Sequence, residues 1–168
     1  MRIQLLSLAL ISVFSFVSCN IISDAPQLSG SEEVVYFSSF ESKAELSGWK
    51  GGYKVIEDSP NGGGIKSAHI SGGCVYPHFY RTLYPTQAEQ WGINAWAKNL
   101  SNGGSITLEN RTTDQSIYLS IQDDEWKQLS SDDLLAVKDG DEVILTLNAG
   151  GFVSSSMLVT SVEVTKGY

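Results

Sequence analysis

Short runs of apolar or alternating residues, each separated from the next by a turn cluster, make up the chain from Val34 onward. The separating segments are SPNGGG, SGG, SNGG, DDE, KDGD and NAGG, in which glycine adopts positive φ and Asn or Asp tolerates it. The strands expected from this pattern are Val34–Phe40, Tyr53–Glu57, Ile65–Ser71, Tyr76–Leu83, Gln90–Lys98, Ser105–Asn110, Ser116–Ile121, Glu125–Leu129, Glu142–Leu147 and Met157–Thr165. Many short strands at this spacing predict an all-β sandwich or barrel over residues 34–168.

Helix has little room in this pattern. Only SKAELSG and SSDDLLAV have a composition that suits it, and each is too short for more than a turn or two. About 150 residues remain after the apolar start of the chain, which is enough for one domain with a sizeable core.

The first 18 residues are of a different kind. Arg2 is their only charged residue, and the uncharged run Leu5–Val17 ends at the small residue Ser18, which is typical of a secretory signal peptide. The run is shorter than the roughly 20 apolar residues of a spanning helix. The ending FVSC resembles the bacterial lipobox, which implies cleavage before Cys19 and acylation of its sulfur and its new amino terminus. An ordinary signal peptide with an incidental cysteine and an uncleaved signal anchor are the alternatives.

Residues 19–33 read as an acylated cysteine followed by a flexible tether, because they are rich in Ser, Pro, Gly and acidic residues and lack periodicity. Several acyl chains hold a protein on a bilayer stably. Asn20 stands where an Asp would signal retention in the inner membrane of many diderms, so we expect the outer membrane or the cell surface. A disulfide between Cys19 and Cys74, the two cysteines of the chain, is the alternative to acylation.

Charge and motifs exclude several classes of function. With 11 basic and 19 acidic residues, the net charge is −8, which argues against nucleic acid and anionic head groups as partners. The sequence has no G-x-S-x-G, H-E-x-x-H or C-x-x-C motif and no phosphate-cradling glycine loop. We therefore expect a protein that is not an enzyme, although the two carboxylates of a glycosidase would carry no motif.

Several segments, taken in order, resemble a known family. They are YFSSFESKAELSGWKGG, QWGINAWAKN, SITLEN, DDEWKQL and VKDGDEVILTLNAGG. They are similar to the galactose-binding-like carbohydrate-binding modules, which show a Phe-Glu pair before Gly-Trp, then an aromatic-led strand ending in Trp-x-Lys. The resemblance covers residues 34–165 and implies a jelly-roll β-sandwich that binds sugar on a concave face or loop rim. It also implies packing roles for Trp49 and Trp126.

The segment Gln90–Lys98 carries the first candidate site. Its alternation places an apolar set toward the core and turns Trp96 and Asn94 to the opposite face. An indole beside polar groups suits a sugar, because a pyranose ring stacks on it while neighbouring side chains bind the hydroxyl groups. The alternative is that a loop or strand covers Trp96.

The segment CVYPHFYRTLY contains the second candidate site. Alternation places Tyr76, His78 and Tyr80 on one face, which offers both ring surface and hydrogen-bonding groups. An ordinary solvated strand face is the alternative. Arg81 falls where related modules often have a ligand-contacting glutamine, so the resemblance implies a ligand role for it; pairing with an acid across the strand is its alternative.

A structural calcium ion is a further implication of the resemblance. Related modules bind it through a Glu of the opening strand and an acidic residue of the closing strand. Glu41 matches the first position, but Thr160 and Ser161 stand where the second acid is expected. Because calcium prefers carboxylate ligands, the sequence puts this ion in doubt; a weak site completed by backbone carbonyl groups is the alternative.

Two functions follow from these patterns. The first is a membrane-anchored extracytoplasmic lipoprotein that binds an oligo- or polysaccharide through an aromatic face, without catalysis. The second is a structural or adhesive surface lipoprotein that binds protein partners and has no sugar site. Exposure of Trp96 and of the tyrosine face would favour the first.

Overall fold

The computed structural model describes residues 33–72 and 78–167, and only the backbone of His78. The lipidation prediction at Cys19, the disulfide alternative with Cys74 and the predicted site residue Tyr76 lie outside the described residues. The described elements are α1 (Lys43–Leu46), β1 (Val34–Ser38), β2 (Trp49–Gly51), β3 (Lys54–Ile56), β4 (Ser67–Ser71), β5 (His78–Leu83), β6 (Glu89–Ser101), β7 (Gly104–Asn110), β8 (Gln115–Ile121), β9 (Lys127–Ser130), β10 (Leu135–Val137), β11 (Val143–Ala149) and β12 (Ser156–Gly167).

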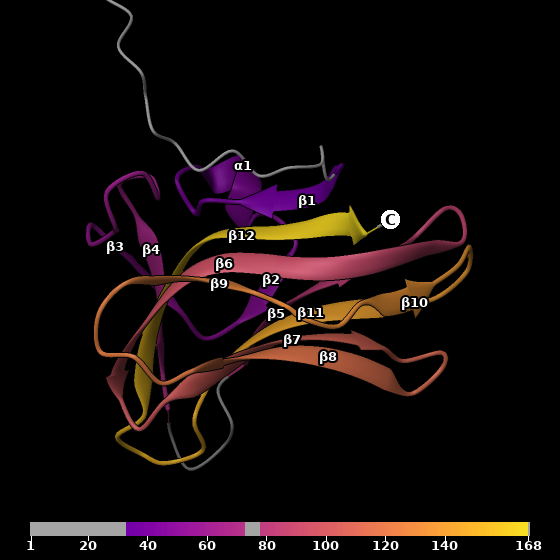
Figure 1. Ribbon diagram of the computed structural model, residues 1–168. Coiled ribbons are helices and arrows are strands. Elements are labelled where there is room, and N and C mark those ends of the chain that lie inside the picture. Colours follow the sequence, from indigo (N-terminus) through magenta and orange to yellow (C-terminus); the bar gives the residue numbers. More distant parts are fainter. Residues whose placement is uncertain (1–32, 73–77, 168) are drawn as a thin grey trace, which may run out of the picture. The chain divides into compact units, whose positions relative to one another are not determined.

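These strands form two antiparallel sheets that face each other (Figure 1). Sheet A has the order β10-β6-β12-β4-β3; β9 also pairs with β6, and β1 also pairs with β12. Sheet B has the order β2-β5-β11-β7-β8. The long strands β6 and β12 pair over most of their length and form the centre of sheet A. The predicted all-β sandwich is confirmed.

Side chains from the inner faces of both sheets fill the core. In β6 the alternation is as predicted: Trp91, Ile93, Ala95 and Ala97 are buried in the core, while Trp96 lies on the other face. The same buried cluster includes Phe79, Ile106, Leu108, Val143, Leu145, Leu147, Val159, Val162 and Val164. The hydrophobic contact between the sheets therefore positions the outward faces, on which a site must lie.

Two short strands were not predicted. The segment SSDDLLAV, which the sequence allows as helix, contains β10, because Leu135 and Val137 both turn into the core and pair with the start of β6. Strand β2 pairs with β5 beside Trp49. The helical turn at SKAELSG is present as α1, where Ser42 caps the helix by accepting a hydrogen bond from the Glu45 N–H at 3.2 Å. Among the described residues, no helix has the length and apolar character needed to cross a bilayer.

Candidate functional site

An aromatic cluster fills one end of the core. The Trp49 and Phe79 rings stack at 4.5 Å, Tyr53 stacks on Phe79 at 4.0 Å, and Phe40 packs on both Trp49 and Phe79. The indole Nε1 of Trp49 donates a hydrogen bond to the Tyr36 hydroxyl at 2.7 Å. Trp49 is buried here, which agrees with the packing role that the resemblance implies.

Arg81 belongs to this cluster. Its guanidinium lies 4.7 Å from the centre of the Tyr36 ring, and its Nη1 donates a hydrogen bond to the Ser47 carbonyl at 2.6 Å. The structure thus gives Arg81 contacts that hold β1 and the turn before β2 against β5. It lies on the opposite face of β5 from Tyr80 and does not join the other predicted ligand residues.

Thr160 is the centre of a ring of backbone carbonyl groups. Its buried hydroxyl lies 3.3 Å from the Ser39 oxygen, 3.1 Å from the Gly63 oxygen and 2.8 Å from the Lys66 oxygen. The neighbouring hydroxyl of Ser161, which has a φ of 47° at a bulge in β12, donates to the same Gly63 oxygen at 3.0 Å. The two hydroxyl groups therefore fasten two loops onto the outer face of sheet A.

Glu41 completes this arrangement from the other side. Its Oε1 accepts hydrogen bonds from the Ile65 N–H at 2.6 Å and the Lys66 N–H at 3.3 Å. Gly64 has a φ of 92°, and a Cβ there would lie 2.7 Å from the same oxygen. The carboxylate thus holds the loop before β4 in a conformation that requires glycine.

The residues present do not fit the calcium ion that the family resemblance implies. Calcium takes six to eight oxygen ligands, usually with carboxylates among them. Here the Thr160 hydroxyl occupies the centre of the carbonyl ring, and Glu41 is bonded to backbone N–H groups. In the described part of the chain, no three His, Cys, Asp or Glu side chains lie close enough to hold a metal. Glu41 therefore has a role in shaping the loop.

Trp96 and Asn94 line a hollow on the outer face of sheet A. One row of register partners crosses four strands there, from Phe37 through Glu163 and Asn94 to Ser130. Gln128 of β9 lies opposite Trp96. The hollow has a volume of about 290 Å³, and the residues that line it are Phe37, Gly62, Asn94, Trp96, Gln128, Ser161 and Glu163.

The hollow combines rings with polar groups. Trp96 is half-buried, and Phe37, which is 47% exposed, adds a second ring at the rim. The Ser130 hydroxyl donates to the Asn94 Oδ1 at 2.6 Å, which fixes the amide so that its NH₂ group is turned away from this bond. The lining of the hollow therefore contains an indole, a phenyl ring, two amides and a carboxylate.

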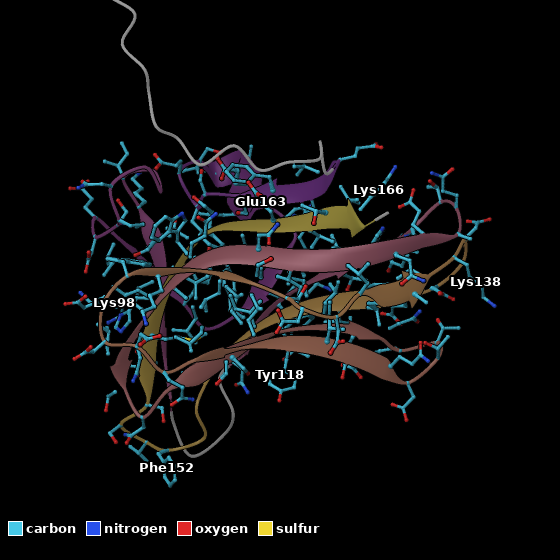
Figure 2. The ribbon with its side chains drawn as sticks, viewed as in Figure 1. Lys98, Tyr118, Lys138, Phe152, Glu163 and Lys166 are labelled. Carbon is cyan, nitrogen blue, oxygen red and sulfur yellow. The ribbon has the colours of Figure 1, made fainter. Side chains whose placement is uncertain are left out.

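Tyr80 lies on a different surface, the outer face of sheet B. It belongs to a row of register partners that crosses the sheet, consisting of Lys50, Tyr80, Thr146, Thr107 and Tyr118. Tyr118 is 69% exposed and projects from β8, whereas Glu163 of the hollow lies on sheet A (Figure 2). The two predicted aromatic faces are therefore separate surfaces. The side chain of His78 is outside the described part.

Four residues of these surfaces were missed in the sequence. Phe37, Gln128 and Glu163 reach the hollow only through strand pairing, which no local pattern reveals. Tyr118 had a local signal, because SIYLSI alternates and its neighbours Ile117 and Leu119 are both in the core.

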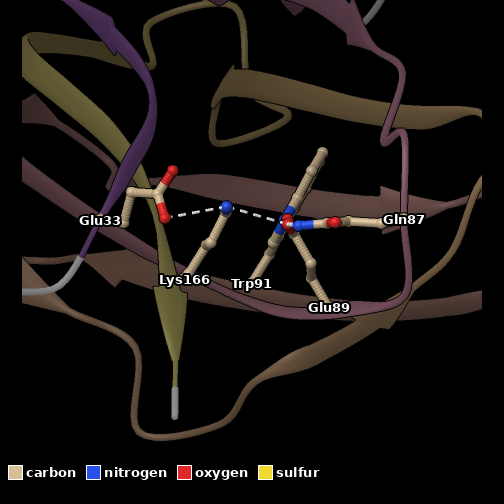
Figure 3. Close-up of polar contacts among 5 residues, drawn as sticks. All are labelled: Glu33, Gln87, Glu89, Trp91 and Lys166. Atoms are coloured by element: carbon tan, nitrogen blue, oxygen red, sulfur yellow. Dashed lines mark hydrogen bonds and ion pairs between the residues drawn. The ribbon is translucent and has the colours of Figure 1, made fainter.

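A charged network joins the ends of three segments of sheet A (Figure 3). The Lys166 Nζ lies 3.0 Å from Glu33 and 3.0 Å from Glu89, and Glu89 also accepts hydrogen bonds from Gln87 and from the Trp91 Nε1. Burial favours a raised pKa for Glu89, but the bonds from Trp91, Gln87 and Lys166 outweigh it and lower the pKa. The bonds to Glu89 and Glu33 raise the pKa of Lys166. The network ties the residue before β1 to β6 and β12.

Comparison with known proteins identifies the fold. No family model and no curated protein sequence matches the chain. Among solved structures, the CBM22-1 xylan-binding domain of Xyn10C from Paenibacillus barcinonensis matches with a TM-score of 0.59 at 14% identity, covering 80% of this chain and 95% of that one. The family 11 carbohydrate-binding module of Lic26A-Cel5E from Clostridium thermocellum matches with a TM-score of 0.50 at 13% identity, covering 81% and 95%.

A third match comes from a larger protein. The enzymatically active domain of tailspike protein 4 of bacteriophage CBA120 has a TM-score of 0.54 at 14% identity, covering 77% of this chain and 20% of that one. At these identities the comparisons concern the fold. The chain has the jelly-roll fold of carbohydrate-binding modules, as predicted.

Proposed function

We propose that this protein binds carbohydrate without catalysis, through the hollow around Trp96 on the outer face of sheet A. The observation that carries the proposal is the composition of that hollow: an indole and a phenyl ring beside Asn94, Gln128 and Glu163. The apolar face of a pyranose packs on aromatic rings, and the amides and the carboxylate suit its hydroxyl groups. The jelly-roll fold, which the xylan-binding domain of Xyn10C shares, supports the same conclusion.

The hollow fits a small part of a glycan. Its volume of about 290 Å³ is at the lower limit of small-molecule sites. Stacking of one ring on an indole buries roughly 50 Å² on each side, which at about 25 cal/mol per Å² gives a few kcal/mol before ordering costs are subtracted. The affinity of a single site is therefore expected to be weak.

The charges of the hollow favour a sugar without acidic groups. Glu163 contributes a carboxylate, and the described residues that line the hollow include no Lys or Arg. A uronic acid or sulfate would face this carboxylate and the net charge of −8 without a compensating cation. Arg81, for which the resemblance implies a ligand role, contacts Tyr36 and Ser47.

The same residues argue against hydrolysis. A glycosidase places two carboxylates about 5 to 10 Å apart across the bond that it cleaves. Glu163 is the single carboxylate among the described residues that line the hollow. Binding without catalysis is the chemistry that this set of side chains supports.

The decisive experiment is retention of the full-length protein, solubilised in detergent, on gels that contain xylan, β-1,4-galactan or hydroxyethylcellulose. We expect Trp96→Ala to reduce retention at least tenfold, and Trp96→Phe to keep part of it because a ring remains. Thr107→Ala, on the outer face of sheet B, is the matched control and should bind as the unaltered protein does. Unchanged retention of Trp96→Ala would reject the hollow as the site, and would favour the adhesive function, for which the exposed pair Phe152 and Val153 offers a contact surface.

The proposed location is a bacterial membrane, reached through acylation of Cys19. Thioether-linked and amide-linked acyl chains drive a protein into the detergent phase of a Triton X-114 partition. Cys19→Ser should move the protein to the aqueous phase, whereas Cys74→Ser should leave it in the detergent. Equal partition of both variants would reject the anchor and leave the sugar site untouched.

A further inference from the structure

A groove runs along the free edge of sheet B, separate from the hollow. Strand β8 pairs with β7 on one side, and among the described residues no strand pairs with its other edge. Residues 129–136, which include the end of β9 and the start of β10, lie opposite that edge. Two adjoining hollows of about 410 and 560 Å³ fill the space between them and share Ser116, Ile117 and Asp133.

The groove is long and narrow. It extends from Gln115 to Ser120, almost the whole of β8, and six strand residues span about 20 Å at roughly 3.3 Å each. A trough of this length fits several units of an extended polymer side by side. A single compact ligand would leave most of it unfilled.

The walls of the groove carry the same chemistry as the hollow. Tyr118 presents an exposed ring on one wall, flanked by the hydroxyl groups of Ser116 and Ser120. Asp132 and Asp133 stand on the other wall. Within residues 33–72 and 78–167, neither the Tyr118 hydroxyl nor these two carboxylates take part in a hydrogen bond or an ion pair. They are available to an incoming ligand.

These carboxylates decide between two kinds of occupant. A polypeptide strand added to the free edge of β8 would bring its backbone against Asp132 and Asp133 and take the charges out of water, which is costly, and charged side chains at sheet edges hinder such pairing. The hydroxyl groups of a sugar can instead donate hydrogen bonds to both carboxylates while a ring packs on Tyr118. The edge therefore favours a glycan over a strand.

We propose that the groove between β8 and residues 129–136 is a second binding site, and that its ligand is a linear, uncharged glycan chain. Tyr118 provides the stacking surface, and Asp132 and Asp133 accept hydrogen bonds from vicinal hydroxyl groups of successive sugar units. Acidic glycans are disfavoured because the described walls of the groove carry two carboxylates and no Lys or Arg. Gln128 of β9 lines the hollow and Ser130 lines the groove, so β9 separates the two sites.

The test is isothermal titration calorimetry of the full-length protein in detergent with cellohexaose, xylohexaose and hexalysine. In the Trp96→Ala background, which isolates the groove, we expect one hexasaccharide to bind. Tyr118→Ala should weaken that binding at least tenfold, and Asp132→Asn with Asp133→Asn about three- to tenfold. Binding should be the same at 0.1 and 0.5 M NaCl, because the ligand is uncharged.

Matched variants control for exposure and charge. Tyr84 is 71% exposed, similar to Tyr118, and lines neither half of the groove, so Tyr84→Ala should bind as the background does. Asp139→Asn removes an exposed carboxylate elsewhere and should also have no effect. These variants change exposed side chains, so their melting temperatures should be similar. Differences in binding between them would therefore not result from loss of folding.

Three results would overturn the groove as a glycan site. The first is that Tyr118→Ala binds the hexasaccharides as tightly as Tyr84→Ala does. The second is that neither hexasaccharide binds in the Trp96→Ala background while the unaltered protein still binds sugar at the Trp96 site. The third is that hexalysine binds in a salt-dependent way that the Asp variants abolish, which would indicate a cationic peptide. The outcomes also separate the two sites. Loss of all sugar binding in Trp96→Ala alone rejects the groove, and loss in Tyr118→Ala alone rejects the hollow.

Discussion

The outer faces of the two sheets consist of similar antiparallel strands but differ in how far the connecting segments cover them. On sheet A, the segments before α1 and before β4 fold over the strands, so that Thr160 is buried although it points away from the core. On sheet B, the row that contains Tyr80 and Tyr118 has no such covering among the described residues. The difference shows that strand alternation sets which residues face outward, whereas the connections decide which of them reach solvent.

The difference in cover between the two faces should also appear as a difference in how substitutions affect stability. The Thr160 and Ser161 hydroxyls donate to carbonyl groups of the covering loops of sheet A, so polar groups of these loops depend on single side chains. Among the described residues, Thr107 and Thr146 on the outer face of sheet B make no side-chain hydrogen bond of this kind. Substitution of Thr160 should therefore change stability more than substitution of an outward threonine of sheet B.

The largest effect is expected at Thr160. Thr160→Ala removes a hydroxyl group that lies within 3.3 Å of three backbone carbonyl oxygens and donates its one hydrogen to one of them at a time, and an unsatisfied buried group costs about 1 to 3 kcal/mol in the free energy of unfolding. We expect a loss of about 2 to 3 kcal/mol in urea denaturation. Thr146→Ala, on the outer face of sheet B, should lose no more than about 1 kcal/mol, which is the range of β-propensity. Equal losses would remove the contrast between the faces.

A smaller effect is expected at Trp126. The resemblance implies a packing role, and the structure shows the indole half-buried, with its Nε1 donating to the Asp58 Oδ1 at 3.1 Å. A fully buried Trp would cost about 3 to 5 kcal/mol on truncation, so Trp126→Ala should cost about 1 to 2 kcal/mol. Tyr118→Ala on sheet B should stay within about 0.5 kcal/mol. A thermal melt that ranks the two in the opposite order would contradict this difference in cover.

Acid should lower the stability of the folded protein by protonating Glu89, the first residue of β6 in sheet A. Because its pKa is lowered in the folded protein, the stability that it contributes is present above its unfolded pKa of about 4.5 and is lost as the pH falls through the lower folded value. Lys166, whose pKa is raised, contributes below about 10.5 and loses its contribution as the pH rises through its higher folded value. Glu89→Gln should flatten the loss of stability below pH 4.5. Glu109→Gln, whose contact with Arg111 on sheet B is exposed and 3.8 Å long, should leave the curve unchanged.

The smallest effect is expected from removal of metal ions. Since Thr160 takes the centre of the carbonyl ring and Glu41 bonds to backbone N–H groups, EDTA should leave the melting temperature of the protein unchanged. A drop of several degrees that calcium restores would show that the loops of sheet A hold an ion after all.

The sequence predicted the features that depend on the local alternation or composition of residues. Alternation in residues 90–98 separated Trp91 and Ile93 from Trp96, and SKAELSG, one of the two segments allowed as helix, contains α1. The pattern did not predict contacts between residues that are distant in the sequence. The carbonyl partners of Thr160 come from residues 94 to 121 positions away, and a four-residue alternation in SSDDLLAV is too short to distinguish β10 from a turn of helix.

The candidate site divides in the same way. Trp96 and Asn94 were predicted to share a face because they lie on one strand. Phe37 and Glu163 were not, because the row that joins them to Asn94 crosses strands that are distant in the sequence. The contact between the Arg81 guanidinium and the Tyr36 ring could not be predicted either, because β1 and β5 are distant in the sequence, and the ligand role of Arg81 stays a prediction.

The position of β1 has a mechanical consequence. Any force on the chain ahead of Glu33 enters the domain at Glu33, the residue before β1, where the Lys166 N–H donates to the Glu33 carbonyl at 2.9 Å and the Lys166 ammonium pairs with its carboxylate at 3.0 Å. From there the load passes through the β1–β12 and β12–β6 ladders to the strand that carries Trp96. Tension between the start of the domain and a glycan held at the hollow would thus run within sheet A, and the packing between the two sheets would bear little of it.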